Sequence, residues 1–363
     1  MQVAVSDVNK AFIRPGDFSH IGLLRKLNIR EYLNAHLIKK RKKFPILSRT
    51  LVWKVYELTL RLYARVEVMK FCGIIARSHA DIVGVWNGQK LPSSGIVFAA
   101  KALGKEVVYF ENGLLPNTTT CDWHGVNCEN AMPAEPEFYR QFASPAPLPQ
   151  TLMPRVPVKA KAQGAGDRLL PEKYVFVPFQ VETDSQIISN SPWIKSMEQL
   201  WQHLSNVVSA FKDDAMHIVI KEHPSEVRSY QHLYHGHPRV IFANQVSTQE
   251  LIENAQAVLT VNSTVGIESL LLKKSVMVMG RACYRIPGIC VSISDEREMA
   301  DTFRQIDSLP IDNTLRDGFL KFMYEMYCIP TTWSQADTVH YQALEKRLMQ
   351  TDEFSGFSEV HRK

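Results

Sequence analysis

Apolar positions change their spacing along this chain, and the change separates a helical beginning from an alternating remainder. Residues 48–78, SRTLVWKVYELTLRLYARVEVMKFCGIIARS, carry apolar side chains at helical spacing and predict one long helix. ADIVGVWNG (80–88) then predicts a strand, SSGIVFAAKALG (93–104) a helix, and KEVVYFENG (105–113) a second strand. Strand, helix and strand with short connections favour a parallel sheet.

A second alternating region follows a proline-rich stretch. Residues 144–168, SPAPLPQTLMPRVPVKAKAQGAGDR, suit neither a helix nor a central strand and predict an interdomain linker. Beyond it, we expect strands at 174–180, 217–224, 257–264 and 275–280, and helices at 191–213, 247–255 and 265–274.

Two Rossmann-like domains joined by a linker describe the α/β architecture called GT-B, with a crevice between the domains. Ligands of open parallel sheets bind beyond the carboxyl ends of the strands. We expect domains at 1–160 and 161–310, and C-terminal helices at 311–363 that pack back across both.

Composition narrows the class of protein. The 363 residues are enough for two domains, and 45% hydrophobic with 22% charged residues is typical of a globular protein. No apolar run approaches the roughly 20 residues of a membrane span, and residues 1–20 lack the apolar centre of a signal peptide. Six cysteines without tight pairing motifs indicate reduced thiols, which favours the cytoplasm.

Charge is concentrated at the N-terminus. Residues 1–43 hold ten Lys and Arg against three Asp and Glu, a net charge of +7, so the rest of the chain nets −2. A basic helix ending in IKKRKKF (38–44) suits the cytoplasmic face of an anionic inner membrane, to which it would bind peripherally, and equally suits a solvated helix end. Nucleic acid is disfavoured because no basic groove interleaved with aromatic residues follows.

Polar residues gather where strands of the second region end, in QVETDSQ, KEHPSE and NSTVGIE. The candidate binding residues there are Gln180, Asp184, Gln186, Lys221, His223, Asn262, Ser263, Thr264, Gly266 and Glu268. The turn at 262–268 is expected to point backbone N–H groups and hydroxyls at a phosphate. Gly266 would allow close approach, and Lys221 and His223 would add donors. Taken singly, helix caps and a His-Pro turn explain the same residues.

The segment ENGLLPNTTTCDWHGVN (111–127) predicts a loop after a buried strand, with two acids, Glu111 and Asp122. The cysteines that flank Asp122 match no common zinc spacing. Neither a Walker motif nor GxGxxG is present in the sequence, which disfavours kinases and dinucleotide oxidoreductases.

These blocks resemble the capsule polysaccharide biosynthesis family, the KpsC/KpsS-like proteins, whose characterised members are retaining β-Kdo glycosyltransferases that use CMP-Kdo. The resemblance runs through residues 80–290 and is carried by AKALGKEVVYFENGLLPNTTTCDWHGVN, FVPFQVETDSQI, IVIKEHPSE and VNSTVGIESLLLKKSVMVMGRACYRIPGI. It implies transfer of Kdo from CMP-Kdo to a cell-surface glycan or glycolipid with retention of the β configuration, by double displacement.

The resemblance also implies roles for single residues. Asp122 would be the nucleophile and Glu111 the acid/base in an acceptor-side site, an assignment that the sequence leaves reversible. The loop residues around them are Gly113, His124 and Asn127. His124 either binds the carboxylate of the donor or fills the loop. The structural alternative is that Glu111 pairs with a basic neighbour and Asp122 caps a turn.

The nucleotide would lie in the domain at 161–310. CMP carries a single phosphate, so no metal or other cofactor is expected, and His223, Ser263 and Thr264 would stabilise the leaving group. Glu268 would meet a ribose hydroxyl. Three alternatives stay open: a GT-B enzyme with another nucleotide sugar, a nucleotide-sugar 2-epimerase, and a non-catalytic capsule export or assembly factor.

Overall fold

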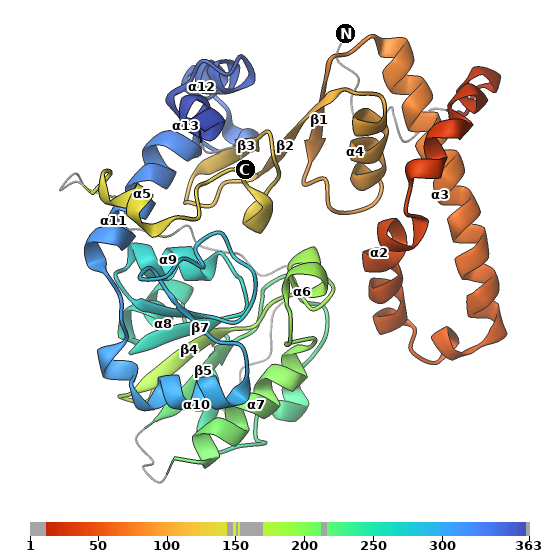
Figure 1. Cartoon of the computed structure of the whole chain (residues 1–363). Helices are drawn as coiled ribbons and strands as arrows, with labels where there is room; N and C mark the ends of the chain where they lie inside the picture. The colour runs from red at the N-terminus through yellow and green to blue at the C-terminus, as the bar shows by residue number, and fades with distance from the viewer. Residues whose placement is uncertain (1–11, 144–147, 150–151, 153–169, 212–215, 361–363) are drawn as a thin grey trace. The chain divides into compact units, whose positions relative to one another are not determined.

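The computed structural model describes residues 12–143, 148–149, 152, 170–211 and 216–360. It divides into two compact units: unit 1 is Met1–Glu111 with Thr120–Ala131, and unit 2 is Asn112–Thr119 with Met132–Lys363. Both contain helices and parallel strands (Figure 1), so the predicted α/β class with two parts is confirmed. The predicted boundary at 160/161, and most of the predicted linker, lie outside the described residues.

Unit 1 begins with helices: η1 (Pro15–Lys26), α2 (Ile29–Lys43), η2 (Leu47–Arg49) and α3 (Leu51–Ser78). Asn28 caps α2 by accepting the backbone N–H of Glu31. The basic run forms the last turns of α2, where positively charged side chains interact favourably with the helix dipole. The long helix predicted from apolar spacing is confirmed, and α2 packs against it as a hairpin (Figure 1).

A strand–helix–strand unit follows, as predicted. β1 (Ile82–Trp86) and β2 (Glu106–Asn112) pair in parallel, from Ile82 with Glu106 to Trp86 with Phe110, and α4 (Ser93–Ala102) connects them. The apolar faces of α3 and α4 close over the sheet, and the core they share includes Val68, Phe71, Ile96, Val107 and Tyr109.

The predicted loop at 111–127 contains a strand instead. β3 (Thr118–Asp122) is buried along its length and is followed by η3 (Asn127–Glu129). It pairs antiparallel with β10 (Ile329–Pro330), in a sheet of order β1-β2-β3-β10. The β-branched threonines suit a strand once a partner is present, and that partner comes from the far end of the chain. This sheet, with one parallel pair, is smaller than a complete Rossmann sheet.

Unit 2 contains a six-stranded parallel sheet. Its strands are β4 (Tyr174–Pro178), β5 (His217–Lys221), β6 (Val240–Phe242), β7 (Ala257–Thr260), β8 (Ser275–Val278) and β9 (Val291–Ser292). The order β6-β5-β4-β7-β8-β9 is the Rossmann arrangement 3-2-1-4-5-6. The central strands are buried on both faces, which is why their sequences are continuous apolar runs.

The helices that cover this sheet are α6 (Ser185–Asn190), α7 (Met197–Ser209), α8 (Thr248–Asn254), α9 (Val265–Leu271) and α10 (Glu296–Arg304), with short turns η4 (Gln231–Leu233) and η5 (Ile306–Ser308). The single helix predicted over 191–213 is wrong at its start. The helix begins only after Ser196, whose side chain accepts the backbone N–H of Gln199. Pro192 lies in the non-helical residues before it, because proline cannot continue a hydrogen-bonded helix.

The C-terminal part of unit 2 is mainly helical in its described residues, as predicted for 311–363. Its elements are α11 (Asn313–Phe322), the π-helical turn η6 (Met323–Tyr327), η7 (Trp333–Gln335), α12 (Thr338–Leu348) and α13 (Glu353–Val360), and α5 (Pro136–Arg140) joins them. Edge-on aromatic contacts tie α5, α11 and α13 together through Phe138, Phe322 and Phe357. That this segment packs across both domains stays a prediction.

Candidate functional site

The sheet of unit 2 reverses its strand order between β4 and β7, which lie side by side at its centre. In open parallel sheets, ligands bind beyond the carboxyl ends of the strands at such a point. Here the chain supplies Gln180 after β4 and Asn262 after β7. The edge formed by these two strand ends, called the switch edge below, is the candidate nucleotide site.

Both amide side chains at the switch edge bind the protein itself. Gln180 Nε2 donates to Asn262 Oδ1 at 2.9 Å, and Gln180 Oε1 accepts the backbone N–H of Asn262 at 3.1 Å. Asn262 Nδ2 donates to the carbonyl oxygens of Gln186 and Asn190 at 2.9 and 3.2 Å. The two predicted site residues are buried and hold the loops of the edge in place.

Gln186 brings a different kind of group to this edge. Asp184 caps α6 by accepting the backbone N–H of Gln186 at 3.0 Å. The Oε1 atom of Gln186 accepts from Asn190 Nδ2 at 3.2 Å. Its Nε2 is buried and has no hydrogen-bond partner in the described part of the chain. A buried donor without a partner is costly, and a bound acceptor would satisfy it.

The predicted phosphate turn is more self-contained than expected. The backbone N–H of Ser263 donates to Thr260 Oγ1, that of Val265 to Ser263 Oγ, and that of Gly266 to the carbonyl of Ser263. A Cβ on Gly266 would lie 2.4 Å from the Tyr284 hydroxyl, so this glycine makes room for a tyrosine. The turn therefore uses three of the N–H groups that the sequence assigned to a ligand.

The side chains of the turn are the groups that a ligand could reach. Ser263, Thr264 and Glu268 are each partly exposed around the start of α9. Their predicted contacts with phosphate and ribose stay predictions, and a ligand would meet hydroxyls here before backbone amides.

Lys221 ends β5 and His223 follows it, and the two side chains make different contacts. Lys221 Nζ donates to the carbonyl oxygens of Asn244, at 3.0 Å, and Val246. Burial lowers the pKa of this lysine. His223 Nδ1 accepts the backbone N–H of Ser225 at 3.1 Å, which places the proton of the neutral ring on Nε2. Lys221 thus anchors the loop after β6, whereas the neutral His223 ring carries its donor hydrogen on Nε2.

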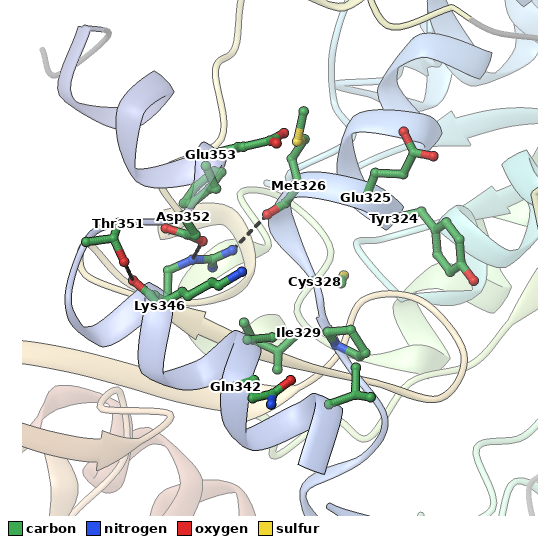
Figure 2. Close-up of a pocket in the computed structure, with 15 residues that line it drawn as sticks. Tyr324, Glu325, Met326, Cys328, Ile329, Gln342, Lys346, Thr351, Asp352 and Glu353 are labelled. Carbon is green, nitrogen blue, oxygen red and sulfur yellow. Dashed lines mark hydrogen bonds and ion pairs between the residues drawn. The ribbon is translucent and has the colours of Figure 1, made fainter. Parts of the chain in front are cut away.

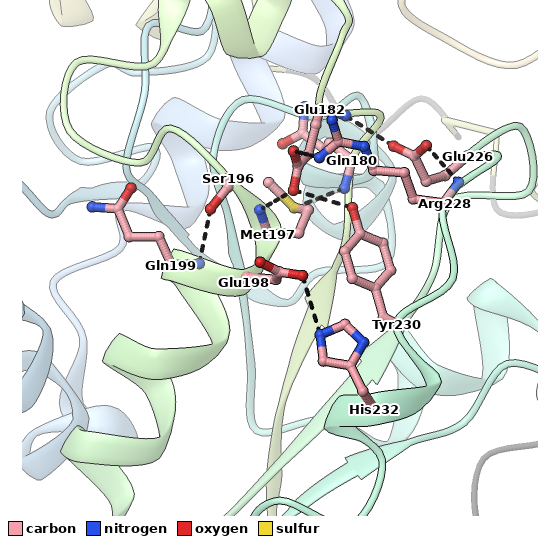
Figure 3. A network of polar contacts seen from close by, with 10 residues as sticks. All are labelled: Gln180, Glu182, Ser196, Met197, Glu198, Gln199, Glu226, Arg228, Tyr230 and His232. Carbon is pink, nitrogen blue, oxygen red and sulfur yellow. Dashed lines mark hydrogen bonds and ion pairs between the residues drawn. The ribbon is translucent and has the colours of Figure 1, made fainter. Parts of the chain in front are cut away.

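Sequence reasoning missed a polar cluster beside the switch edge (Figure 3). Glu182 is almost fully buried, and its carboxylate accepts from the backbone of Met197 at 2.9 Å, the Tyr230 hydroxyl at 3.2 Å and the Arg228 guanidinium. Glu226 accepts the backbone N–H groups of Glu182 and Arg228, each at 3.0 Å. Glu182 lies within the quoted motif QVETDSQ, but its partners lie up to 48 positions away.

In unit 1, Glu111 lies near the carboxyl end of the parallel pair of β1 and β2. Its Oε2 accepts from Asn87 Nδ2 at 2.6 Å. Asn87 occupies the left-handed turn after β1, and its own side-chain oxygen accepts the backbone N–H of Gln89. Glu111 is partly exposed. Asn87 thus orients the Glu111 carboxylate, and the Asn-Gly strand ending in the sequence marks its position.

Asp122 has the opposite environment. It is fully buried at the end of β3. One carboxylate oxygen accepts the backbone N–H groups of His124 and Gly125, at 2.7 and 3.3 Å, and the other accepts that of Ala131 at 2.8 Å. The geometry is that of the turn-capping alternative, and in this conformation the carboxylate holds a loop.

Of the other predicted loop residues, Gly113 and Asn127 shape the backbone, and His124 faces solvent. A Cβ on Gly113 would lie 1.8 Å from Thr118 Oγ1, so only glycine fits the tight turn between β2 and β3. Asn127 takes a left-handed conformation, with φ of 59°, and shapes the loop. His124 is exposed.

A cavity of about 460 Å³ lies elsewhere in unit 2, lined by η6, β10, α12 and α13 (Figure 2). Arg347 is buried beside it, donates to Asp352 and to the carbonyl oxygens of Met326 and Tyr327, and stacks over Phe354. None of the predicted site residues lines this cavity. Because Arg347 is already bound to Asp352 and to two backbone carbonyl oxygens, it holds the surrounding helices together. The cavity is therefore a weaker candidate for a ligand site than the switch edge.

Comparison with known proteins adds the family. Residues 156–325 match the family described as capsule polysaccharide biosynthesis protein. Protein FixF of Sinorhizobium fredii is 36% identical over 271 residues, which are 74% of this chain. The chain belongs to the capsule polysaccharide biosynthesis family. The family predicted from the motifs is therefore confirmed.

Further relatives in the capsule polysaccharide biosynthesis family are more distant. The capsule polysaccharide export protein KpsS of Escherichia coli is 27% identical and matches 52% of this chain. The capsule polysaccharide modification protein LipB of Neisseria meningitidis is 32% identical and matches 44%. The matches cover 64% of FixF and KpsS and 38% of LipB, so the chain spans less than two thirds of these relatives.

Solved structures resemble the chain only at a distance. Thermosulfurimonas dismutans KpsC, a beta Kdo 2,7 transferase, is 17% identical, with a TM-score of 0.43 over 77% of this chain and 89% of that one. Staphylococcus aureus MnaA with UDP is 10% identical, with a TM-score of 0.35 over 78% of each chain. At these scores the likeness carries no argument about activity.

Within the described ranges, no group of three or more His, Cys, Asp or Glu side chains is arranged to hold a metal ion. In the same part of the chain, no helix has the length and apolarity that a membrane span needs.

Proposed function

We propose that this chain is a glycosyltransferase that takes Kdo from CMP-Kdo and transfers it to a cell-surface glycan or glycolipid with retention of the β configuration. Membership of the capsule polysaccharide biosynthesis family and the Rossmann order of the unit 2 sheet support a nucleotide-sugar enzyme. The choice of CMP-Kdo rests on the resemblance of the sequence motifs to the KpsC/KpsS-like proteins.

One observation carries the location of the nucleotide. Gln186 Nε2 is buried at the switch edge and has no partner in the part of the chain that the structure describes. The hydroxyls of Ser263 and Thr264 and the ring of His223 are the further groups proposed to bind the phosphate of CMP. Lys221, which binds two carbonyl oxygens, is left out of this set. A single phosphate needs no metal, so turnover is expected to survive EDTA.

The reacting carboxylate is proposed to be Glu111. Double displacement needs a carboxylate that reaches the anomeric carbon, and a second group that handles the proton of the acceptor. Glu111 is partly exposed and is oriented by Asn87, whereas Asp122 is buried and holds three backbone N–H groups. We therefore assign the nucleophile to Glu111 in place of Asp122, and we assign Asp122 the role of shaping the loop.

Calorimetry with cytidine, uridine and guanosine monophosphates tests the site. CMP should bind more tightly than UMP or GMP, and Gln186→Ala should weaken CMP binding by about tenfold, the usual cost of losing one buried hydrogen bond. Gln202→Ala is the matched control, because Gln202 is exposed on α7. Equal CMP affinity in wild type and Gln186→Ala contradicts the nucleotide site.

Product analysis tests the reaction. With CMP-Kdo and lipid or oligosaccharide acceptors, mass spectrometry should show one added Kdo, and Glu111→Gln should lower transfer by about a thousandfold or more. Without acceptor, a covalent Kdo should map to the peptide that contains residue 111, and a label on residue 122 restores the first assignment. Turnover of another nucleotide sugar, or epimerised product, would replace the donor or the reaction. No turnover with any donor would favour the export role that the name of KpsS suggests.

A further inference from the structure

α3 is apolar on two opposite faces. One face is buried in unit 1 and includes Trp53, Ala64, Val68 and Phe71. This face packs against α2, α4 and η1. It is the face that the helical spacing of the sequence is expected to bury, and it accounts for the position of the helix.

The second face points to solvent. Its residues recur every three or four positions and form one line along the helix, called the α3 stripe: Leu51, Val55, Leu58, Leu62 and Val66. Each of these side chains is between 41% and 74% exposed. Such a continuous apolar line is unusual on a solvated surface, because single exposed apolar residues are common but contiguous ones mark an interaction site.

The stripe continues onto the connection between α2 and α3. Phe44, Ile46 and Leu47 lie there, and Ile46 is 84% exposed. Figure 1 shows this connection at the free end of the α2–α3 hairpin of unit 1. The apolar surface therefore covers both the tip of the hairpin and one side of its longer helix.

The charges around this surface have one dominant sign. α2 ends in Lys39, Lys40, Arg41, Lys42 and Lys43, and the basic residues near the stripe are Arg49, Lys54, Arg61 and Arg65. At 100° per residue, Lys54, Arg61 and Arg65 lie along one edge of the stripe. The acid Glu57 is already paired with Arg41 and Arg61. The rim of the apolar surface is therefore basic.

An apolar surface with a basic rim favours one kind of binding partner over another. A second copy of the same face would bring like charges together, which opposes self-association. An anionic bilayer offers phosphates to the rim and acyl chains to the stripe, as interfacial amphipathic helices require. We propose that the α3 stripe and the hairpin tip dock the protein on an anionic lipid surface, with α3 lying in the plane of the bilayer. The proposal goes beyond the basic run of the sequence, and it does not depend on transfer activity.

Sedimentation with vesicles tests it. The full chain should bind vesicles that contain phosphatidylglycerol and bind pure phosphatidylcholine vesicles on the order of tenfold less, because the rim needs anionic lipid. Leu58→Glu with Leu62→Glu should lower binding to the anionic vesicles by at least about tenfold. Raised salt should weaken wild-type binding without abolishing it, since the apolar part is not screened.

The matched control is Val227→Glu with Val339→Glu, two exposed valines of unit 2 that receive the same charges. This control should bind vesicles as the wild type does. Circular dichroism checks that both variants are folded, and Leu58→Gln with Leu62→Gln, which adds no charge, should also lose binding. Equal vesicle binding by the stripe variants and the wild type overturns the proposal. So does a wild-type dimer that the stripe substitutions split while vesicles remain unbound, because the occupant would then be a second copy.

Discussion

The end of β3 and the loop after β4 each contain a buried carboxylate, and the two carboxylates find their hydrogen-bond donors by different means. Asp122 accepts backbone N–H groups from residues two, three and nine positions later. Glu182 accepts from a guanidinium, a phenol and a helix start that lie 15 to 48 positions later. A short-range acid shapes its own loop, whereas a long-range acid ties separate loops of one sheet together. The difference predicts how much each acid contributes to stability.

The largest effect is expected at Glu182. Glu182→Ala removes the acceptor for the Met197 N–H, the Tyr230 hydroxyl and the Arg228 guanidinium, two of them on buried residues. Removing one partner of such a buried cluster should lower the free energy of unfolding by about 3 kcal/mol. Urea denaturation measures it. Glu182→Gln is the control, because its remaining oxygen still accepts from Met197 and Tyr230, and it should lose less.

A smaller loss is expected at Asp122. Asp122→Asn keeps one acceptor for His124 and Gly125 but turns an amide donor toward the N–H of Ala131. One unsatisfied, partly buried N–H should lower the free energy of unfolding by about 2 kcal/mol. Thermal and urea unfolding of the variant check it. An Asn variant as stable as the wild type, yet unable to transfer sugar, would make Asp122 a reacting group.

Arg228 should matter less than the acid that it binds. Its side chain is 38% exposed. In Arg228→Ala, water can therefore replace part of the hydrogen bonding that the guanidinium gives to the Glu182 carboxylate. The expected loss is about 1 kcal/mol. A double-mutant cycle with Glu182→Gln isolates the pair. No coupling energy between the two substitutions would show that the amide and phenol contacts, and not the ion pair, hold the cluster.

Asp17 in unit 1 extends the comparison to pH and should show the smallest effect. Burial raises the pKa of Asp17, but hydrogen bonds from the Arg77 guanidinium and the Arg14 backbone outweigh it, so the pKa lies below its usual value. A lowered folded pKa stabilises the protein above the unfolded pKa, and this stabilisation is lost as pH falls through the folded value.

The measurement compares the wild type with Asp17→Asn by denaturant unfolding at neutral pH and near pH 3. The wild type should be the more stable protein at neutral pH, and the difference should shrink in acid. A difference that is constant with pH would mean that the Asp17 charge does not contribute.

Local signals in the sequence predicted the parts of the fold that local physics controls. The strand–helix–strand of 80–113 and the long helix of 48–78 were predicted because apolar spacing and end residues act over a few positions. The turn-capping alternative for Asp122 was available for the same reason. β3 was missed because its pairing partner, β10, lies more than 200 positions away, and the start of α7 was misplaced because Pro192 and the Ser196 cap were overlooked.

At the candidate site, the sequence by itself determined which polar residues follow the strands, since hydrophobic runs and their ends are written along the chain. It did not determine which of those residues bind the protein. Gln180 and Asn262 meet only because β4 and β7 become neighbours, and Lys221 finds its carbonyl oxygens only when the loop after β6 folds beside it. Hydrogen bonds act over about 3 Å, so contacts between distant residues exist only in the folded chain. The tertiary structure therefore decided that Glu111 is accessible and Asp122 is not, and it left the apolar stripe of α3 facing solvent.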